Sequence, residues 1–425
     1  MRCLIIITVL FLTVNSLYAI TLDEAVKVAL ENNYQINSVR HLATASKHIL
    51  SATKALKMPS FFLNSEYTYL NDSNNIKFST PFGSENLKMT EQDYINLSTG
   101  IKLNLYTGGF ISGSISKALH NYYASKYKLQ ETELDVKYNT QIAYINILEL
   151  LSYKKIAEKH LEALEKHYKN VECFYNEGMV PYIDMLQTEV KVKDAVQKLT
   201  SINNSVKVAK TNLVIILGKE ATDNISIVNI KKNYIKKFKT DILFNIAKEN
   251  RPVLKMLDCK IKAAESEIQI ASSGYKPKIF VAGGYNYSDM QPSVEHKDNF
   301  LFQTGLTFQL DWDKSFNEVK AAKENKYALI INKKDIESKI LLGVKKVFED
   351  YNTAVSNLQV ANSTVKSAKE YYRTIKLKYK EGLTDNSHVL DAEAMLTKAL
   401  MTEKTFYFNI IKKFFLMERV IGKEF

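Results

Sequence analysis

Few residues in this 425-residue chain have the types and spacing that support catalysis or metal binding. The sequence has no glycine-rich phosphate loop, no HExxH zinc motif and no paired CxxC motif. Its seven histidines are scattered, and only His160 and His167 stand out as a pair that would share a helix face. No acid or thiol cluster completes a metal set around them, so surface or hydrogen-bonded histidines are the simpler interpretation. We therefore expect a protein that is not an enzyme and uses no cofactor or metal.

The most informative feature of the sequence is a long internal repeat. The segment YNEGM at residues 175–179 recurs as YKEGL at residues 379–383, 204 positions further along the chain. Nearer the start the offset is 218, which carries Pro59 to Pro277. Self-similarity at fixed offsets indicates a repeated architecture, so we predict two copies of one large unit.

The two copies are predicted to span residues 20–220 and 221–425, the second of which opens with an equatorial segment. The offset changes between Tyr69 and Gly100. We expect a surface loop there, because loops tolerate insertions better than helices or strands do.

The start of the chain has the features of a secretory signal. A charged residue is followed by a short apolar run at residues 3–14 and by a small residue, Ala19. This run is shorter than the roughly 20 residues of a membrane-spanning helix, so we predict a signal peptide at residues 1–19. The other two cysteines, Cys173 and Cys259, are too few for a disulfide framework. They are expected to be buried or free thiols, with a single bridge as the alternative.

The chain is basic, with a formal net charge of +12. Such a balance can favour anionic partners. The lysines, however, are mixed with acidic residues along helical segments, which is typical of solvated helix faces. We therefore expect no nucleic-acid partner.

Two proline-free segments, residues 111–177 and 315–381, are rich in helix formers and have apolar residues at three-to-four spacing. Each is about 67 residues long, which corresponds to about 100 Å at ~1.5 Å per residue. Each meets a Glu-Gly pair and is followed by a second helical segment, at residues 182–217 and 386–421. The pattern predicts a long antiparallel helical hairpin that occurs twice.

Four segments have the alternation of β-strands. Polar and apolar residues alternate cleanly at 94–105 and 300–311, and less cleanly at 61–70 and 278–287. Alternation over about ten residues suits a transmembrane barrel strand, although a sheet half-buried on a soluble core alternates in the same way. Four strands cannot close a barrel in lipid, because the smallest membrane barrels need about eight and open edges are not tolerated there. If these strands span a membrane, several chains must contribute to one barrel.

The order of these elements and three local motifs resemble one family, the outer membrane factors, which are TolC-like efflux ducts of Gram-negative bacteria. The opening segment at residues 21–33 is similar to the family's first helix. Gly108-Gly109 matches its turn from strand to helix, and residues 379–392 match its second hairpin tip. Each motif is weak alone, but their order and spacing across residues 20–425 are specific.

The resemblance implies an α plus membrane β-barrel fold with four transmembrane strands and two long helical hairpins per chain. It implies a homotrimer that builds a 12-stranded β-barrel in outer membrane lipid and a hollow α-barrel across the periplasm. A periplasmic adaptor protein and an inner-membrane pump would feed this duct. The expected location is the bacterial outer membrane, with an extension into the periplasm.

The resemblance also implies a periplasmic gate at the hairpin tips. Asp184 matches a family aspartate, and Tyr379 matches the tyrosine that bonds it across helices; such a charge-assisted bond suits a latch. Asp391 matches one of two carboxylates that line the family's constriction, where crowded like charges favour cations. Thr384 stands in place of a latch arginine and His388 in place of the other carboxylate, so we expect the charge of the mouth to change when His388 titrates. The alternative is that these are ordinary polar positions.

The two glycine turns have a structural and a functional interpretation. Glycine permits a turn that needs a positive φ. In the functional interpretation the turns and their neighbours dock the helical tip of the adaptor. The residues involved would be Glu177, Gly178, Met179, Glu381, Gly382 and Leu383.

Three functions fit these observations. The leading hypothesis is the exit duct of a tripartite efflux system that exports small molecules. The exit duct of a type I protein secretion system is the alternative, because the pump selects the cargo. A soluble periplasmic coiled-coil scaffold agrees less well with the strand alternation and the signal.

Overall fold

The computed structural model describes residues 19–221, 225–230, 232–292 and 294–425; the predicted signal peptide lies outside the described residues except for Ala19. The chain forms two compact units, each assembled from separated segments. Unit 1 contains the segment that ends at Arg40, together with Leu129–Pro252 and Glu337–Phe425. Unit 2 contains His41–Lys128 and Val253–Ile336. Both units draw on both predicted repeats, whose boundaries stay a prediction.

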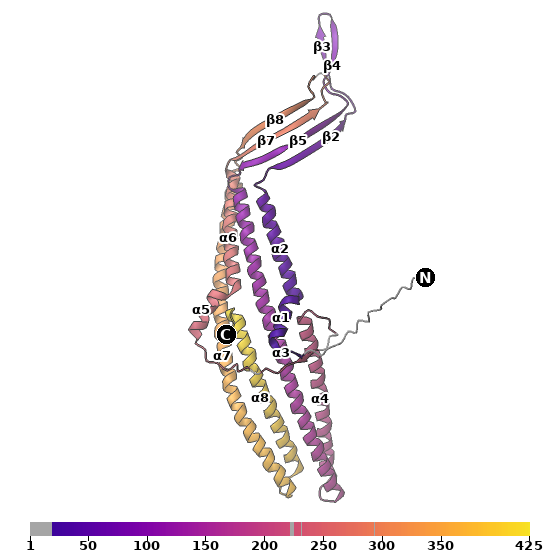
Figure 1. Ribbon diagram of the computed structural model, residues 1–425, viewed down its shortest axis with the longest axis vertical. Helices are drawn as coiled ribbons and strands as arrows, with labels where there is room; N and C mark the ends of the chain where they lie inside the picture. The colour runs from indigo at the N-terminus through magenta and orange to yellow at the C-terminus, as the bar shows by residue number, and fades with distance from the viewer. Residues whose placement is uncertain (1–18, 222–224, 231, 293) are drawn as a thin grey trace, which may run out of the picture. The chain divides into compact units, whose positions relative to one another are not determined.

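Four helices form the two long hairpins (Figure 1). The outgoing helices are α3 (Phe110–Asn176) and α7 (Trp312–Lys380), which have 67 and 69 residues. The returning helices are α4 (Tyr182–Ile216) and α8 (Asn386–Ile421), which have 35 and 36 residues. These bounds agree with the predicted hairpins, except that α7 begins at Trp312 rather than at residue 315. Among the described residues, no helix combines the length and apolar composition that crossing a bilayer requires.

Shorter helices precede each strand pair and cap the ends of the hairpins. They are α1 (Leu22–Asn32), α2 (Tyr34–Ala55), α5 (Thr240–Asn250), α6 (Pro252–Ser272) and the 3-10 turn η1 (Ser273–Tyr275). Asn33 donates its side-chain N–H to Ile216 O at 2.8 Å, and Arg251 donates to Val420 O at 3.0 Å. These two side chains, 218 positions apart, satisfy carbonyls near the ends of α4 and α8, which lack partners within the helix.

The four predicted strands form one antiparallel sheet in unit 2, in the order β2-β5-β7-β8. They are β2 (Ser60–Tyr69), β5 (Asp93–Tyr106), β7 (Lys278–Ser288) and β8 (Asp298–Thr307). The register places Phe61, Ile101, Gly283 and Phe302 in one row across the sheet. Because side chains alternate along each strand, most apolar positions of the four strands share the face of this row, while Phe62, Phe280 and Leu301 lie on the other face.

The strand predicted at residues 300–311 extends four residues beyond the C-terminal end of the observed strand β8. β8 stops at Thr307, which pairs with Lys278, the first residue of β7. Beyond this pair β7 has no residue left to bond, so the alternating residues that follow remain outside the sheet.

The segment expected to be a surface loop contains a β-hairpin, so that expectation was wrong. β3 (Asn75–Thr80) pairs with β4 (Gly83–Lys88), and the turn contains Pro81. Apolar Ile76 lies opposite Leu87 across the hairpin, while the next residues along both strands are polar. A further parallel pairing of two residues, β1 (Ala19–Ile20) with β6 (Ser226–Ile227), is too short to leave a pattern in the sequence.

Candidate functional site at the hairpin tips

Both hairpin tips in unit 1 have the same backbone turn. Gly178 and Gly382 have φ values of +73° and +70°, which residues with a side chain rarely adopt. The residue after each glycine donates its N–H to the carbonyl five positions earlier, at 2.8 Å in both tips. This bond is typical of a Schellman motif. A Cβ on either glycine would meet no atom within 4 Å, so only the backbone requires glycine here.

The six predicted docking residues are exposed in the single chain. Met179 and Leu383, which follow the glycines, are each 69% exposed. Glu177 and Glu381 precede the glycines and also face solvent. Each tip thus presents one acidic and one apolar side chain, and their docking to an adaptor stays a prediction.

The five predicted gate residues lie at or near the tips. Asp184 is in the first turn of α4, and Tyr379 is in the last turn of α7. Thr384 is half-buried in the turn before α8. His388 and Asp391 of α8 are both exposed and are three residues apart, so they share a helix face. Their roles in a constriction stay predictions.

The predicted hydrogen bond between Tyr379 and Asp184 is absent from the single chain. The Tyr379 hydroxyl is buried and has no hydrogen-bond partner among the described residues. Burial raises the pKa of Tyr379, and the Asp184 charge raises it further, which means that the carboxylate is nearby. Burial and the charge of Asp385 likewise raise the pKa of Asp184. The latch roles of both residues stay predictions.

A different set of side chains joins the two hairpins, and we refer to His167, Thr188 and Asn386 as the hub. His167 of α3 lies 2.7 Å from Asn386, the first residue of α8, measured from Nε2 to Oδ1. The Asn386 Nδ2 group donates to the Asp184 backbone carbonyl and to Thr188 Oγ1, both at 3.1 Å. Thr188 and Asn386 are 0% exposed and His167 is 8% exposed. The hub therefore connects α3, α4 and α8 inside unit 1.

The chemistry of the hub fixes the direction of each hydrogen bond. A backbone carbonyl only accepts, so the amide nitrogen of Asn386 must face Asp184, and its oxygen must face His167. His167 must then donate from Nε2, which assigns the tautomer of the neutral ring. Thr188 Oγ1 donates to the Asp184 carbonyl at 2.8 Å. Both amide protons and the amide oxygen of Asn386 are thereby used.

An aromatic ring of α7 packs against the imidazole. The Tyr379 ring meets His167 edge-on, with centroids 5.3 Å apart and planes at 65°, and Phe174 packs on Tyr379. Burial lowers the pKa of His167; the hydrogen bond to Asn386 opposes this effect, and the charge of Lys376 adds to it. Burial, the largest of these effects, favours the neutral ring.

A second histidine joins the same two helices two turns away. His160 Nδ1 of α3 lies against the carboxylate of Glu393 of α8, and Glu393 is 5% exposed. Thr397 donates to the same carboxylate at 3.2 Å. Both histidines are therefore hydrogen-bonded or paired, as the simpler interpretation of the sequence expected. The described part of the chain has no group of three or more His, Cys, Asp or Glu side chains suited to a metal ion.

Polar pairs continue along the contact between α3 and α8. Glu149 pairs with Lys412 at 2.6 Å, and Asp135 pairs with Arg419 at 2.5 Å. Apolar packing between the helices also contributes near the tips, through a cluster of Leu164, Ala195 and Leu390. The two hairpins are thus joined by specific polar contacts as well as by apolar burial.

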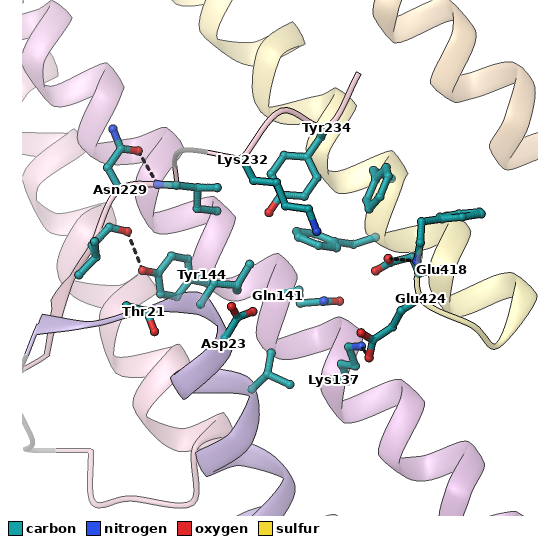
Figure 2. A pocket seen from close by; sticks show the side chains of 17 residues that line it. Thr21, Asp23, Lys137, Gln141, Tyr144, Asn229, Lys232, Tyr234, Glu418 and Glu424 are labelled. Atoms are coloured by element: carbon teal, nitrogen blue, oxygen red, sulfur yellow. Dashed lines mark hydrogen bonds and ion pairs between the residues drawn. The ribbon is translucent and has the colours of Figure 1, made fainter. Parts of the chain in front are cut away.

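Unit 1 also contains a cavity of about 360 Å³ that is lined by residues of α1, α3 and α8 and by residues 228–230, 232 and 234. Figure 2 shows Tyr144, Lys137 and Glu418 pointing into it. Three of its polar groups have partners within the chain: the Tyr144 hydroxyl lies 2.6 Å from Val228 O, Lys137 pairs with Glu424, and Glu418 accepts from Phe425 N at 2.9 Å.

The sequence did not reveal Asn386, although His167 had been singled out. Asn386 lies in the run Thr384–Ser387, whose residue types are typical of a helix start. The available signal was its departure from the repeat, because the matched residue 204 positions earlier is Tyr182.

The model of the outer membrane efflux protein family matches residues 25–219 and 243–406. The chain belongs to this family. This membership confirms the resemblance seen in the sequence and the predicted location in the outer membrane. This outer membrane efflux protein is similar to the probable efflux pump outer membrane protein TtgC of Pseudomonas putida, with 22% identity over 307 residues. That match covers 68% of the chain and 61% of TtgC.

Another relative matches along nearly the whole chain. The outer membrane protein TolC of Vibrio cholerae is 19% identical over 418 residues, which cover 96% of this chain and 92% of TolC. By contrast, the chain spans only 61% of the length of the Pseudomonas putida relatives.

Solved structures establish the fold. The channel CusC superposes with a TM-score of 0.82 at 14% identity, covering 95% of this chain and 92% of CusC. VceC of Vibrio cholerae superposes with a TM-score of 0.81 at 14% identity, covering 95% and 96%. The chain therefore has the α plus β fold of TolC-like channels.

Proposed function

We propose that this outer membrane efflux protein is the exit duct of a tripartite efflux system and exports small molecules as a homotrimer. In this proposal it works without catalysis and without a cofactor. Three chains form a 12-stranded β-barrel in outer membrane lipid, and their helical hairpins form a hollow α-barrel in the periplasm. An inner-membrane pump and a periplasmic adaptor supply the cargo.

The four-stranded sheet is the observation that carries the proposal. Its edges, β2 and β8, have no further strand partner among the described residues. Phe61, Phe300 and Phe302, on the apolar face, are 71%, 87% and 79% exposed in the single chain. Unpaired edges are costly in lipid, and a membrane barrel needs about eight strands or more. Three sheets joined edge to edge satisfy both requirements and turn the apolar face toward lipid.

The assembly is tested by the mass of the detergent-solubilised protein and by its conductance in planar bilayers. We expect a particle of three chains that forms pores. A monodisperse single chain that forms the same pores would overturn the trimer, and a trimer without any pore would overturn the duct.

The adaptor is tested by a photo-crosslinking amino acid placed at Met179 or Leu383 in cells that express the system. We expect both tip positions to crosslink to the adaptor. Val208 of α4 is a matched exposed control at 71% exposure, outside the tips, and should not give the same product. Equal crosslinking at all three positions would contradict docking at the tips.

A further inference from the structure

We propose that Asn386 is the positioning residue of the periplasmic gate, and that it holds α8 against α3 and α4 through neutral, buried hydrogen bonds rather than through a charged latch. This inference rests on the proposed duct function, in which the hairpin tips form the gate. It concerns which contacts hold the second hairpin in place.

The geometry places Asn386 at the centre of the polar contacts that the start of α8 makes with the other hairpin. It is the first residue of α8, and its amide reaches His167 at 2.7 Å, the Asp184 carbonyl at 3.1 Å and Thr188 at 3.1 Å. All three partners belong to the other hairpin. An outward movement of the start of α8 therefore breaks all of these bonds together. Thr188 and the Asp184 carbonyl keep their own hydrogen bond, but the buried Nε2 donor of His167 loses its partner.

The charged groups of the tip do not provide this tie in the single chain. Asp184 takes part through its backbone carbonyl. The Tyr379 hydroxyl is buried without a partner among the described residues, and position 384 is a threonine. Hydrogen bonds between neutral, buried groups are little affected by salt, whereas exposed charged contacts are screened.

Burial favours a neutral His167, although Nε2 can donate to Asn386 in the neutral and in the charged ring. The side chain is 8% exposed, and the Tyr379 ring packs against it edge-on. A proton added to the ring would place a charge in a buried site. The titratable and charged groups around it are Lys376 and Tyr379 of α7, Asp184 of α4, and Glu393 of α8. The tie is therefore expected to respond to acid more than to salt.

The repeat supplies a matched control. Tyr182 begins α4 as Asn386 begins α8, but it is 51% exposed and contacts Tyr175 of its own hairpin, with ring centroids 5.4 Å apart. A substitution there changes the start of a helix at the same distance from a glycine turn without touching the hub.

The test measures the distance between the two tips by double electron–electron resonance. Spin labels are attached to Met179→Cys and Leu383→Cys in full-length protein whose three native cysteines are replaced by Cys3→Ser, Cys173→Ser and Cys259→Ser. Labelled chains are diluted with unlabelled ones. We expect a narrow distance distribution in this background and in Tyr182→Leu. Asn386→Leu should give a longer and broader distribution, although its side chain is similar in size.

Two His167 variants separate positioning from a merely structural role. His167→Gln retains a neutral donor near the Nε2 position, so it should keep the narrow distribution and lose its sensitivity to acid. His167→Leu removes the donor and should broaden the distribution as Asn386→Leu does. Raising the salt from about 0.05 to 0.5 M should change none of these distributions.

Several results would overturn the proposal. An unchanged distribution in Asn386→Leu, or equal broadening in Tyr182→Leu, would remove the special role of Asn386. Broadening of the unsubstituted hub by salt would show that charges hold the tip. Circular dichroism checks that each variant remains helical, and a variant that unfolds is replaced by Asn386→Ser, which keeps a polar side chain but cannot reach all three partners.

Bilayer recordings separate this inference from the proposed function. If the protein is a duct, Asn386→Leu should raise the resting current several-fold, and Tyr182→Leu should leave it unchanged. Absence of pores in every variant would contradict the duct, while the tip distances would still decide the role of Asn386. Normal pores with unchanged resting current in Asn386→Leu would contradict the hub alone.

Discussion

The tips of the α3–α4 and α7–α8 hairpins have the same backbone turn, with glycine φ values of +73° and +70°. Their side chains differ at the matched residue that begins each returning helix. Tyr182 is 51% exposed and contacts a tyrosine of its own hairpin. Asn386 is fully buried and bonds to the other hairpin.

The two tips therefore share their local backbone structure and differ in their tertiary contacts. The turn is local, because it depends on one glycine and on hydrogen bonds between residues close in sequence. The tie between the hairpins is tertiary, because it needs three helices to bring His167, Thr188 and Asn386 together. A repeat can therefore retain its turn while one copy acquires a contact that the other lacks.

The largest expected difference between the tips comes from truncating the two matched residues. Asn386→Ala removes the centre of the hub and leaves His167 with an unused buried donor, which should cost about 2–3 kcal/mol. Tyr182→Ala removes a half-exposed ring contact and should cost about 1 kcal/mol. Thermal unfolding followed by circular dichroism compares the two, and equal losses would remove the distinction between the tips.

The shared backbone should respond equally in both tips. Gly178→Ala and Gly382→Ala each force a side chain into a left-handed conformation, which should cost about 1–2 kcal/mol. Neither added Cβ meets an atom within 4 Å, so the backbone conformation alone sets the cost. The same unfolding measurement applies. A clearly larger loss at one glycine would mean that the two turns are not equivalent.

The smallest effect is expected from a change of pH on the distance between the tips. It distinguishes the two tips because only the start of α8 is held by a bond to His167. Burial lowers the pKa of His167 in the folded protein below its ordinary value of about 6.5. The stabilisation is therefore complete above about pH 6.5 and is lost as the pH falls through the folded pKa. Tip distances should therefore stay narrow above about pH 6.5 and broaden only as the pH falls below it. An equal response in His167→Gln would assign the effect to another group.

The elements that depend on local patterns were predictable from the sequence. Helix formers without proline gave α3 and α7 to within a few residues. The alternation of polar and apolar residues predicted the four strands of the sheet. It did not show that β8 ends at Thr307, where its pairing with β7 ends. The β3–β4 hairpin was missed because its polar residues and Pro81 resemble a loop, and its two strands have only six residues each.

The candidate site was predictable only in part. The positive φ of the two glycines followed from the need for a turn. The hub did not, because Asn386 lies in a run of residues typical of helix caps and its partners are about 200 positions away. The Tyr379–Asp184 bond came from a family resemblance, and in the single chain the Tyr379 hydroxyl has no partner among the described residues. The roles of His388 and Asp391 depend on neighbouring chains and stay predictions.

Hydrogen exchange of the full-length protein in detergent tests most directly whether Asn386 couples the two hairpins. The amides to compare are those of the second and third turns, at residues 186–192 of α4 and 390–396 of α8. In Asn386→Leu we predict faster exchange in both segments together, whereas Tyr182→Leu should affect α4 alone. Faster exchange in α8 without any change in α4 would contradict the coupling.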